Sequence, residues 1–189
     1  MKRHLLIAVL LLALSACAQY SLVEAKKQEI GGAYTVEAQI AWNKSSEGKL
    51  EIWTVDGPSL NAVRFFKGLG DGDALFKIPR KTKEEAKLPT YRSGMTPNDV
   101  MDLVADSVAR IGANDVQTRN LRPIDFGGNP GFRFEVTFYS SDGLELDGLV
   151  AGAIVEEKLH MIMYTGARLH YFPKYKEDVE RLIGSVEMI

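Results

Sequence analysis

The side chains with the most reactive chemistry in this sequence are few. Cys17 is the only cysteine among the 189 residues, so the chain can form neither an internal disulfide nor a zinc site built on several cysteines. His160 and His170 lie apart, and neither has a second ligand at the spacing that zinc sites use. We expect no metal ion, and we assign His160 to the more polar face of a strand and His170 to a junction before the last helix.

Two further patterns that could bind or react are incomplete. Asp71-Gly72-Asp73 resembles the start of a calcium-binding loop, but Leu75 and Thr82 occupy positions that would need oxygen ligands. The sequence also has no Gly-x-Ser-x-Gly motif for a serine nucleophile. We therefore expect no cofactor and no catalytic residue, and we predict that the protein is not an enzyme.

The first residues have the pattern of an export signal. Lys2 and Arg3 form a short basic region, and residues 5–14 form an apolar stretch. A helix that crosses a bilayer needs about 20 apolar residues, so this stretch of about ten is too short for a retained transmembrane anchor.

The end of this signal carries a specific motif. Leu14-Ser15-Ala16-Cys17 resembles the lipobox of bacterial lipoproteins, in which an aliphatic residue and two small residues precede a cysteine. The resemblance covers the first 17 residues, and it implies cleavage before Cys17 and acylation of its sulfur and new amino group. Several acyl chains anchor stably, since each buried CH₂ contributes about 0.8 kcal/mol. The alternative is an ordinary secretory signal followed by a chance cysteine.

The residue after the cysteine suggests a destination. In Gram-negative lipoproteins, which this segment resembles, an aspartate at that position favours retention in the inner membrane, and this chain has Ala18. The resemblance thus implies an outer-membrane protein of the cell envelope, facing the periplasm and attached through its lipid. We divide the chain into a signal peptide (residues 1–16), a lipidated tether (17–30) and one globular domain (31–189).

Composition supports a folded domain and excludes one class of partner. Hydrophobic residues make up 46% of the chain, enough for a packed core. The 23 Lys and Arg residues are outnumbered by 25 Asp and Glu, for a net charge of −2. Nucleic-acid-binding domains are usually clearly basic, so we expect no nucleic acid as partner.

Alternating apolar residues predict an antiparallel sheet of six or seven strands. We expect a hairpin of strands at residues 34–42 and 50–55, and a further strand at 60–66. Short turns favour an antiparallel meander for the next strands, which we place at residues 116–124, 131–139, 146–155 and 159–165. The segment 149–154 is apolar on both faces, so we expect it to be central and covered on both sides.

Two amphipathic helices complete an α+β fold. The first begins near Thr96, a good N-cap, with Pro97 at the first helical position and Gly112 just past the end. The second begins near Pro173 and continues almost to the C-terminus, with one apolar stripe and a charged opposite side.

The order of these elements resembles the Mog1/PsbP-like α/β/α sandwich. An early hairpin, a middle helix, a four-strand meander and a closing helix follow one another in the same order, and residues 161–186 have the most similar placement of aromatic side chains. The resemblance covers about residues 30–189. It implies a fold whose members mostly bind or scaffold rather than catalyse.

Two groups of mostly basic side chains could bind anions. The first group lies near predicted strand and helix ends and could form a pocket for an acidic ligand; it comprises Arg122, Arg168, His170 and Tyr171. The second could contact anionic headgroups at about 1 kcal/mol per basic residue; it comprises Lys77, Arg80, Lys81, Lys83 and Lys87. Glu84 and Glu85 reduce the net positive charge of the second group. The alternative interpretation of this segment is a solvated loop.

The leading functional hypothesis is a non-catalytic envelope lipoprotein whose domain binds or scaffolds an envelope protein partner or a small ligand. The alternative hypothesis is a periplasmic hydrolase whose site assembles around His170 and Arg168, with Asp178 as a third candidate. A deep pocket with convergent polar groups would favour the hydrolase, and a shallow apolar patch would favour the protein partner.

Overall fold

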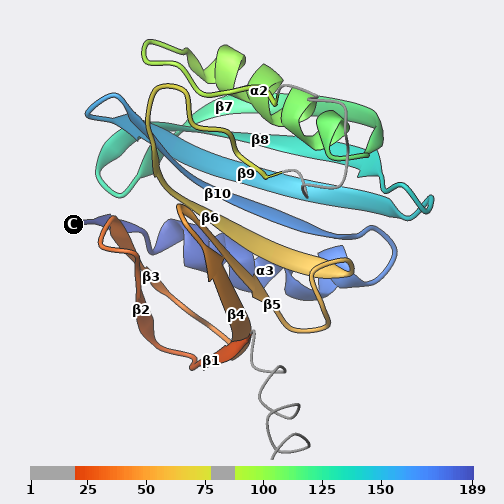
Figure 1. Ribbon diagram of the computed structural model, residues 1–189. Coiled ribbons are helices and arrows are strands. Elements are labelled where there is room, and N and C mark those ends of the chain that lie inside the picture. Colours follow the sequence, from red (N-terminus) through yellow and green to blue (C-terminus); the bar gives the residue numbers. More distant parts are fainter. Residues whose placement is uncertain (1–19, 78–87) are drawn as a thin grey trace, which may run out of the picture.

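The computed structural model describes residues 20–77 and 88–189 (Figure 1). Cys17 and Ala18 lie outside the described residues, as do Arg80, Lys81 and Lys83 and the neighbouring Lys87. Lipidation and headgroup contact therefore stay predictions. Within the described ranges, no helix is long and apolar enough to cross a membrane.

The described chain forms one large antiparallel sheet of eight strands, which confirms the α+β class with one strand more than the upper number predicted. The strand order is β1-β4-β5-β6-β10-β9-β8-β7. The strands are β1 (Ser21–Val23), β4 (Trp42–Glu47), β5 (Leu50–Thr54), β6 (Asn61–Leu69), β7 (Asn114–Phe126), β8 (Asn129–Tyr139), β9 (Glu145–Val155) and β10 (Lys158–Ala167).

The second half of this sheet is the predicted meander. β7, β8, β9 and β10 pair with one another in sequence order, and every pair is antiparallel. Gly127 and Gly128 connect β7 to β8 with φ angles of 62° and 82°, which glycine adopts without a steric penalty. β6 pairs with β5 on one side and with β10 on the other, so it joins the β4–β5 hairpin to the meander.

A second, smaller sheet has the strand order β11-β3-β2 and consists of β2 (Lys27–Ile30), β3 (Tyr34–Glu37) and β11 (Glu187–Met188). The prediction of one strand over residues 34–42 is therefore wrong, because the chain leaves the small sheet after Glu37 and enters the large sheet at Trp42. Tyr34, Val36 and Trp42 all lie in the same core. The alternation of apolar residues thus continues between Glu37 and Trp42, so it does not indicate that the chain changes from one sheet to the other there.

The chain enters the fold earlier than the predicted boundary at Gly31. β1 pairs with β4, and β2 pairs with β3. Val23 is 2% exposed and Ile30 is fully buried, and both belong to the core. Residues 21–30 are thus part of the folded domain rather than a tether, because they pair with two strands and bury Val23 and Ile30.

The first described helix, α2 (Pro97–Arg110), begins where Thr96 predicts. The Thr96 hydroxyl accepts a hydrogen bond from the Asp99 amide at 3.3 Å, and the Asp99 carboxylate accepts one from the Thr96 amide at 2.8 Å. This reciprocal pair is a capping box. Gly112 follows the helix with a φ of 106°, as the sequence predicts.

The closing helix, α3 (Tyr171–Gly184), begins two residues before the predicted Pro173. Gly166 near the end of β10 allows the first turn of α3 to lie close to the strand, because a Cβ there would lie 2.8 Å from the Phe172 backbone. α2 lies on one face of the large sheet, and α3 and the small sheet lie on the other (Figure 1). Each face has its own hydrophobic core.

β9 has the central position that its composition predicts. Leu149 and Ala151 belong to the core beside α3, and Val150 belongs to the core beside α2. Gly152 in β9 also lies very close to the neighbouring strand. A Cβ on Gly152 would lie 2.5 Å from the carbonyl oxygen of His160 on β10, so this glycine permits close contact between neighbouring strands.

Candidate functional site

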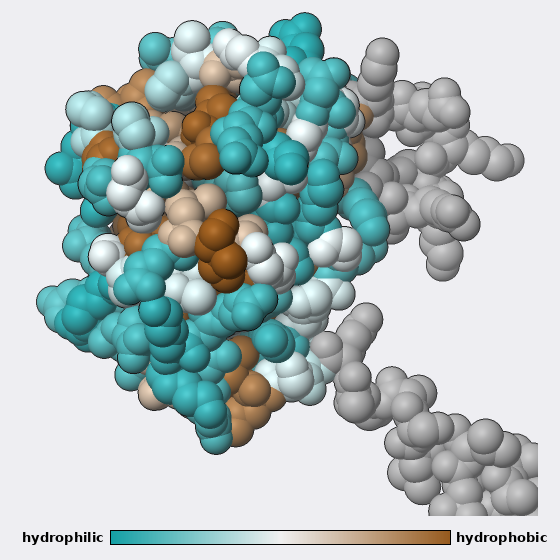
Figure 2. Space-filling model, turned by 90° about the vertical axis from the view of Figure 1, so that its left-hand side faces the viewer, coloured by the Kyte–Doolittle hydropathy of each residue, from teal (hydrophilic) through white to brown (hydrophobic). Residues whose placement is uncertain are grey.

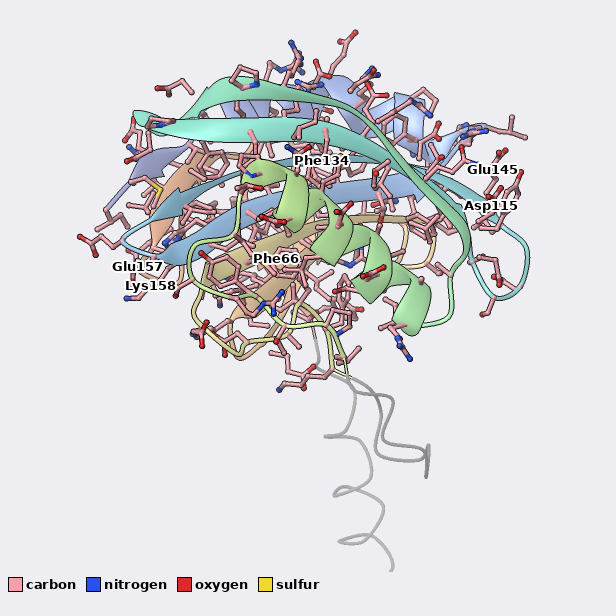
Figure 3. The ribbon with its side chains drawn as sticks, turned by 90° about the horizontal axis from the view of Figure 1, so that it is seen from above. Phe66, Asp115, Phe134, Glu145, Glu157 and Lys158 are labelled. Carbon is pink, nitrogen blue, oxygen red and sulfur yellow. The ribbon has the colours of Figure 1, made fainter. Side chains whose placement is uncertain are left out.

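A cavity opens over the large sheet between the C-terminal end of α2 and the turn that connects β8 to β9. α2 packs on β7 and β8, and Tyr91 of the preceding loop joins the same core. Figure 3 looks down on this face, with Phe66 of β6 and Phe134 of β8 on either side of α2. The cavity has a volume of about 220 Å³. Its walls are mainly apolar side chains: Phe76, Val108, Ile111, Phe138, Leu144, Leu146 and Met163.

Arg64 brings a positive charge into this apolar cavity. It lies in β6 between Val63 and Phe65 of the opposite core, so its side chain lies on the α2 side. Its Nη1 donates a hydrogen bond to the Thr165 hydroxyl at 2.7 Å. In the part of the chain that the structure describes, no carboxylate lies within 4.0 Å of its guanidinium.

The surroundings of Arg64 make its charge unfavourable without a partner. Burial lowers the pKa of Arg64 to about 10, because desolvation disfavours the charged form. The guanidinium nevertheless remains charged at neutral pH. It has five N–H donors, and Thr165 accepts from one nitrogen. A desolvated charge without a counterion is destabilising, so an anion at Arg64 would relieve that penalty.

The rim of the cavity carries the opposite charge. Ser140 lies in the β8–β9 turn, and its hydroxyl donates to the Asp142 carboxylate at 2.5 Å and accepts from the Leu144 amide at 3.0 Å. The bond from Ser140 lowers the pKa of Asp142, which therefore stays ionised at neutral pH. A negatively charged group would be repelled at this rim and attracted at Arg64 inside. The arrangement suits a small ligand with an anionic head and an apolar body.

The structure does not assemble the anionic pocket predicted around Arg168. The guanidinium of Arg168 forms ion pairs with Glu145 and with Asp147, the latter at 2.7 Å. Hydrogen bonding to Asp147 raises the pKa of Arg168. The charge of this arginine is thus neutralised by two carboxylates of β9. Arg168, which the sequence predicted to bind an acidic ligand, is thus already paired with acidic side chains of the protein itself.

The other predicted members of that pocket lie elsewhere or have other roles. Arg122 is exposed and opposite Arg133 in the β7–β8 register, away from the end of the sheet where Arg168 lies. His170 is the N-cap of α3, without a side-chain capping hydrogen bond. The Tyr171 carbonyl accepts a hydrogen bond from the Tyr164 hydroxyl at 2.8 Å. Arg122 therefore does not join the other three residues in one pocket, and the Tyr171 carbonyl connects the start of α3 to β10.

The residues of the hydrolase hypothesis do not converge in the described chain. Asp178 accepts a hydrogen bond from Arg181 at 2.5 Å, within α3. His170 lies two helical turns earlier, and Arg168 pairs with β9. The described residues also contain no group of three or more His, Cys, Asp or Glu that could hold a metal ion.

His160 differs from the prediction of a polar strand face. It is only 8% exposed, its ring lies 6.1 Å from that of Tyr34, and its Nδ1 has no hydrogen-bond partner among the described atoms. A Cβ on Gly68 would lie 3.1 Å from the His160 ring, so the absence of that atom makes room for the imidazole. The small sheet buries this histidine. The residues next to His160 in the sequence do not predict this burial.

The two ends of the large sheet differ in character. Asp115 and Glu145 lie at the end that carries the β8–β9 turn and the cavity, whereas Glu157 and Lys158 lie at the opposite end (Figure 3). Figure 2 views the molecule from that opposite end, where the surface is mainly hydrophilic and hydrophobic side chains form small, separate groups. A broad apolar docking surface is therefore absent from the face drawn in Figure 2.

The topology and layer order define a PsbP-like α+β fold. Among solved structures, the chain is similar to the solution structure of cyanobacterial PsbP (CyanoP) from Synechocystis sp. PCC 6803. The TM-score is 0.57 and the sequence identity is 13%, and the alignment covers 93% of this chain and 95% of the cyanobacterial chain.

Comparison by sequence is uninformative. No protein-family model matches the chain, and no curated protein matches it. The predicted resemblance is thus confirmed for the PsbP-like fold, and similarity at this level of identity extends to the fold and not to the function.

Proposed function

We propose that this protein is a lipid-anchored envelope protein whose domain binds a small amphiphilic anion in the Arg64 cavity without transforming it. The lipobox supports the anchor, and the export signal supports the compartment. The one observation that carries the ligand class is Arg64, a partly buried guanidinium in a mainly apolar cavity, without a carboxylate in ion-pair distance among the described residues.

The composition of the cavity favours binding over catalysis. No histidine, cysteine or lysine lines it among the described residues. The Ser140 hydroxyl is directed to the Asp142 carboxylate within its own turn, without an imidazole to activate it. The volume of about 220 Å³ lies below the range of roughly 300–1,000 Å³ typical of drug-sized ligands, so the ligand is small.

Calorimetric titration with hexanoate, a small carboxylate with an apolar body, tests the ligand class. We expect hexanoate to bind and hexanol to bind more weakly. Arg64→Met should lower the hexanoate affinity by about 10- to 100-fold, because a hydrogen bond to a charged group contributes about 1.5–3 kcal/mol. Arg119→Met is the matched control, since Arg119 is exposed and pairs with Glu135. Equal affinities for Arg64→Met and the unmodified protein would contradict the proposal.

The anchor is tested separately by fractionation. We expect the unmodified protein in the outer-membrane fraction and a Cys17→Ser variant in the soluble periplasmic fraction, because the variant lacks the sulfur that takes the lipid. An ordinary secretory signal would place both proteins in the soluble fraction. Recovery of the lipidated protein in the inner membrane would contradict the destination inferred from Ala18 while leaving the anchor intact.

A further inference from the structure

A second cavity lies beside the first on the same face of the sheet. It has a volume of about 290 Å³, and Leu50, Phe66, Leu69 and Leu75 contribute apolar wall. Phe66 follows Arg64 by two residues in β6, so the two side chains share a face about 7 Å apart along the strand. The second cavity thus continues the first in the direction of the β6 strand.

Phe76 lines both cavities. Its ring lies 6.0 Å from that of Phe66 in an edge-to-face arrangement. Phe76 is partly exposed, in contrast to the fully buried Phe66. A partly exposed side chain on a loop can change rotamer at less expense than one inside a packed core. Phe76 therefore lies between the two spaces, and a change of its rotamer would connect them.

The charges around the second cavity are already paired. Lys49 contacts Asp73 at 2.6 Å, and Lys77 contacts Glu47 at 2.9 Å. Neither pair needs an ion from a ligand, so this cavity provides apolar wall without competing for an anionic head. In contrast, Arg64 in the first cavity has no carboxylate partner among the described residues. One end of the combined space therefore attracts charge and the other accepts hydrocarbon.

We propose that the ligand is a straight-chain monocarboxylate whose head lies at Arg64, and that Phe76 sets the chain length by separating the two cavities. The inference rests on the proposed function, since it takes Arg64 as the binding group. A short chain fills the first cavity and ends against Phe76, and a longer chain enters the second cavity when Phe76 is displaced.

The test is a titration of the full-length protein with unbranched carboxylates from butyrate to dodecanoate. For the unmodified protein, affinity should rise by about fourfold per methylene and then stop rising when the first cavity is full. In Phe76→Ala the rise should continue to chains at least two carbons longer. Phe76→Leu should give an intermediate limit, and it also guards against a failure of the alanine variant to fold.

Phe138→Ala is the matched control, because Phe138 lines only the first of the two cavities. It should weaken binding at all lengths without moving the limit. An unchanged limit in both Phe76 variants would overturn the role of Phe76 while leaving the proposed function intact. Carboxylate binding that is absent, or that is insensitive to Arg64→Met, would overturn the proposed function itself.

Discussion

At the scale of single residues, burial controls the chemistry of His160. Desolvation lowers the pKa of His160, and the nearby charge of Lys158 lowers it further, while Glu156 acts in the opposite direction. Tyr34 packs edge-on against the ring and offers no charge. The imidazole is therefore neutral in the folded protein at a pH where an exposed histidine would begin to take up a proton.

This lowered pKa predicts a loss of stability on mild acidification. The unfolded chain binds a proton at His160 near pH 6.5 and the folded chain does so only at lower pH, so the free energy of unfolding should fall as pH drops from 7.5 to 5.5. In His160→Gln this component should disappear. Urea unfolding at both pH values measures it, and His170→Gln is the control, because His170 is exposed. Equal pH slopes in the unmodified protein and His160→Gln would contradict the prediction.

At the scale of elements, the contact between β9 and β10 depends on a missing side chain. A Cβ on Gly152 would lie 2.5 Å from the His160 carbonyl oxygen and 3.1 Å from the Met161 Cα. Both are backbone atoms of a central strand that has neighbours on each side. Neither strand can move away without disturbing its other partner.

Gly152→Ala should therefore lower the free energy of unfolding by about 1–3 kcal/mol, as overpacking in a core does. Gly184→Ala is the matched control, since nothing lies within 4 Å of a Cβ at that last residue of α3. The control should be neutral or stabilising by up to about 1 kcal/mol, because alanine is the better helix former. Chemical denaturation of both variants is the measurement, and equal losses in the two would show that close strand contact is not the cause.

At the scale of the whole molecule, the N-terminal strands lie close in sequence to Cys17, the proposed site of the lipid anchor. Cys17 and Ser21 are four residues apart, and an extended chain covers at most about 14 Å over that length. With the lipid in the bilayer, the domain would therefore lie directly at the membrane surface.

Deletion variants test whether the strands before Gly31 belong to the fold. A chain that begins at Gly31 loses the buried side chains of Val23 and Ile30, together with the partners of β3 and β4. Its free energy of unfolding should fall by at least about 3 kcal/mol, since two large core side chains are removed. A chain that begins at Tyr20 is the control and should keep full stability. Equal stability of both chains would restore the interpretation of residues 17–30 as a tether.

The sequence by itself determined the features that depend on near neighbours in the chain. The capping box of α2 needs only Thr96 and Asp99 three residues apart, and the meander follows from short turns between alternating strands. The α+β class and the PsbP-like order of elements follow from these local patterns. In each case the interacting residues are close in sequence, so their spacing carries the information.

Only the tertiary structure decided which distant residues meet. Arg64 is the one charged residue between Ala62 and Phe66. The alternation of residue types in this segment is equally consistent with a strand face exposed to solvent and with the floor of a cavity. Its cavity forms because β6 pairs with β10 and the end of α2 leaves a space over these two strands unfilled. Conversely, the sequence predicts that Arg168 binds an acidic ligand. In the structure its charge is instead neutralised by Glu145 and Asp147, which lie more than twenty positions away in the chain. Desolvation and charge pairing depend on register and layer packing, and these are global properties of the fold.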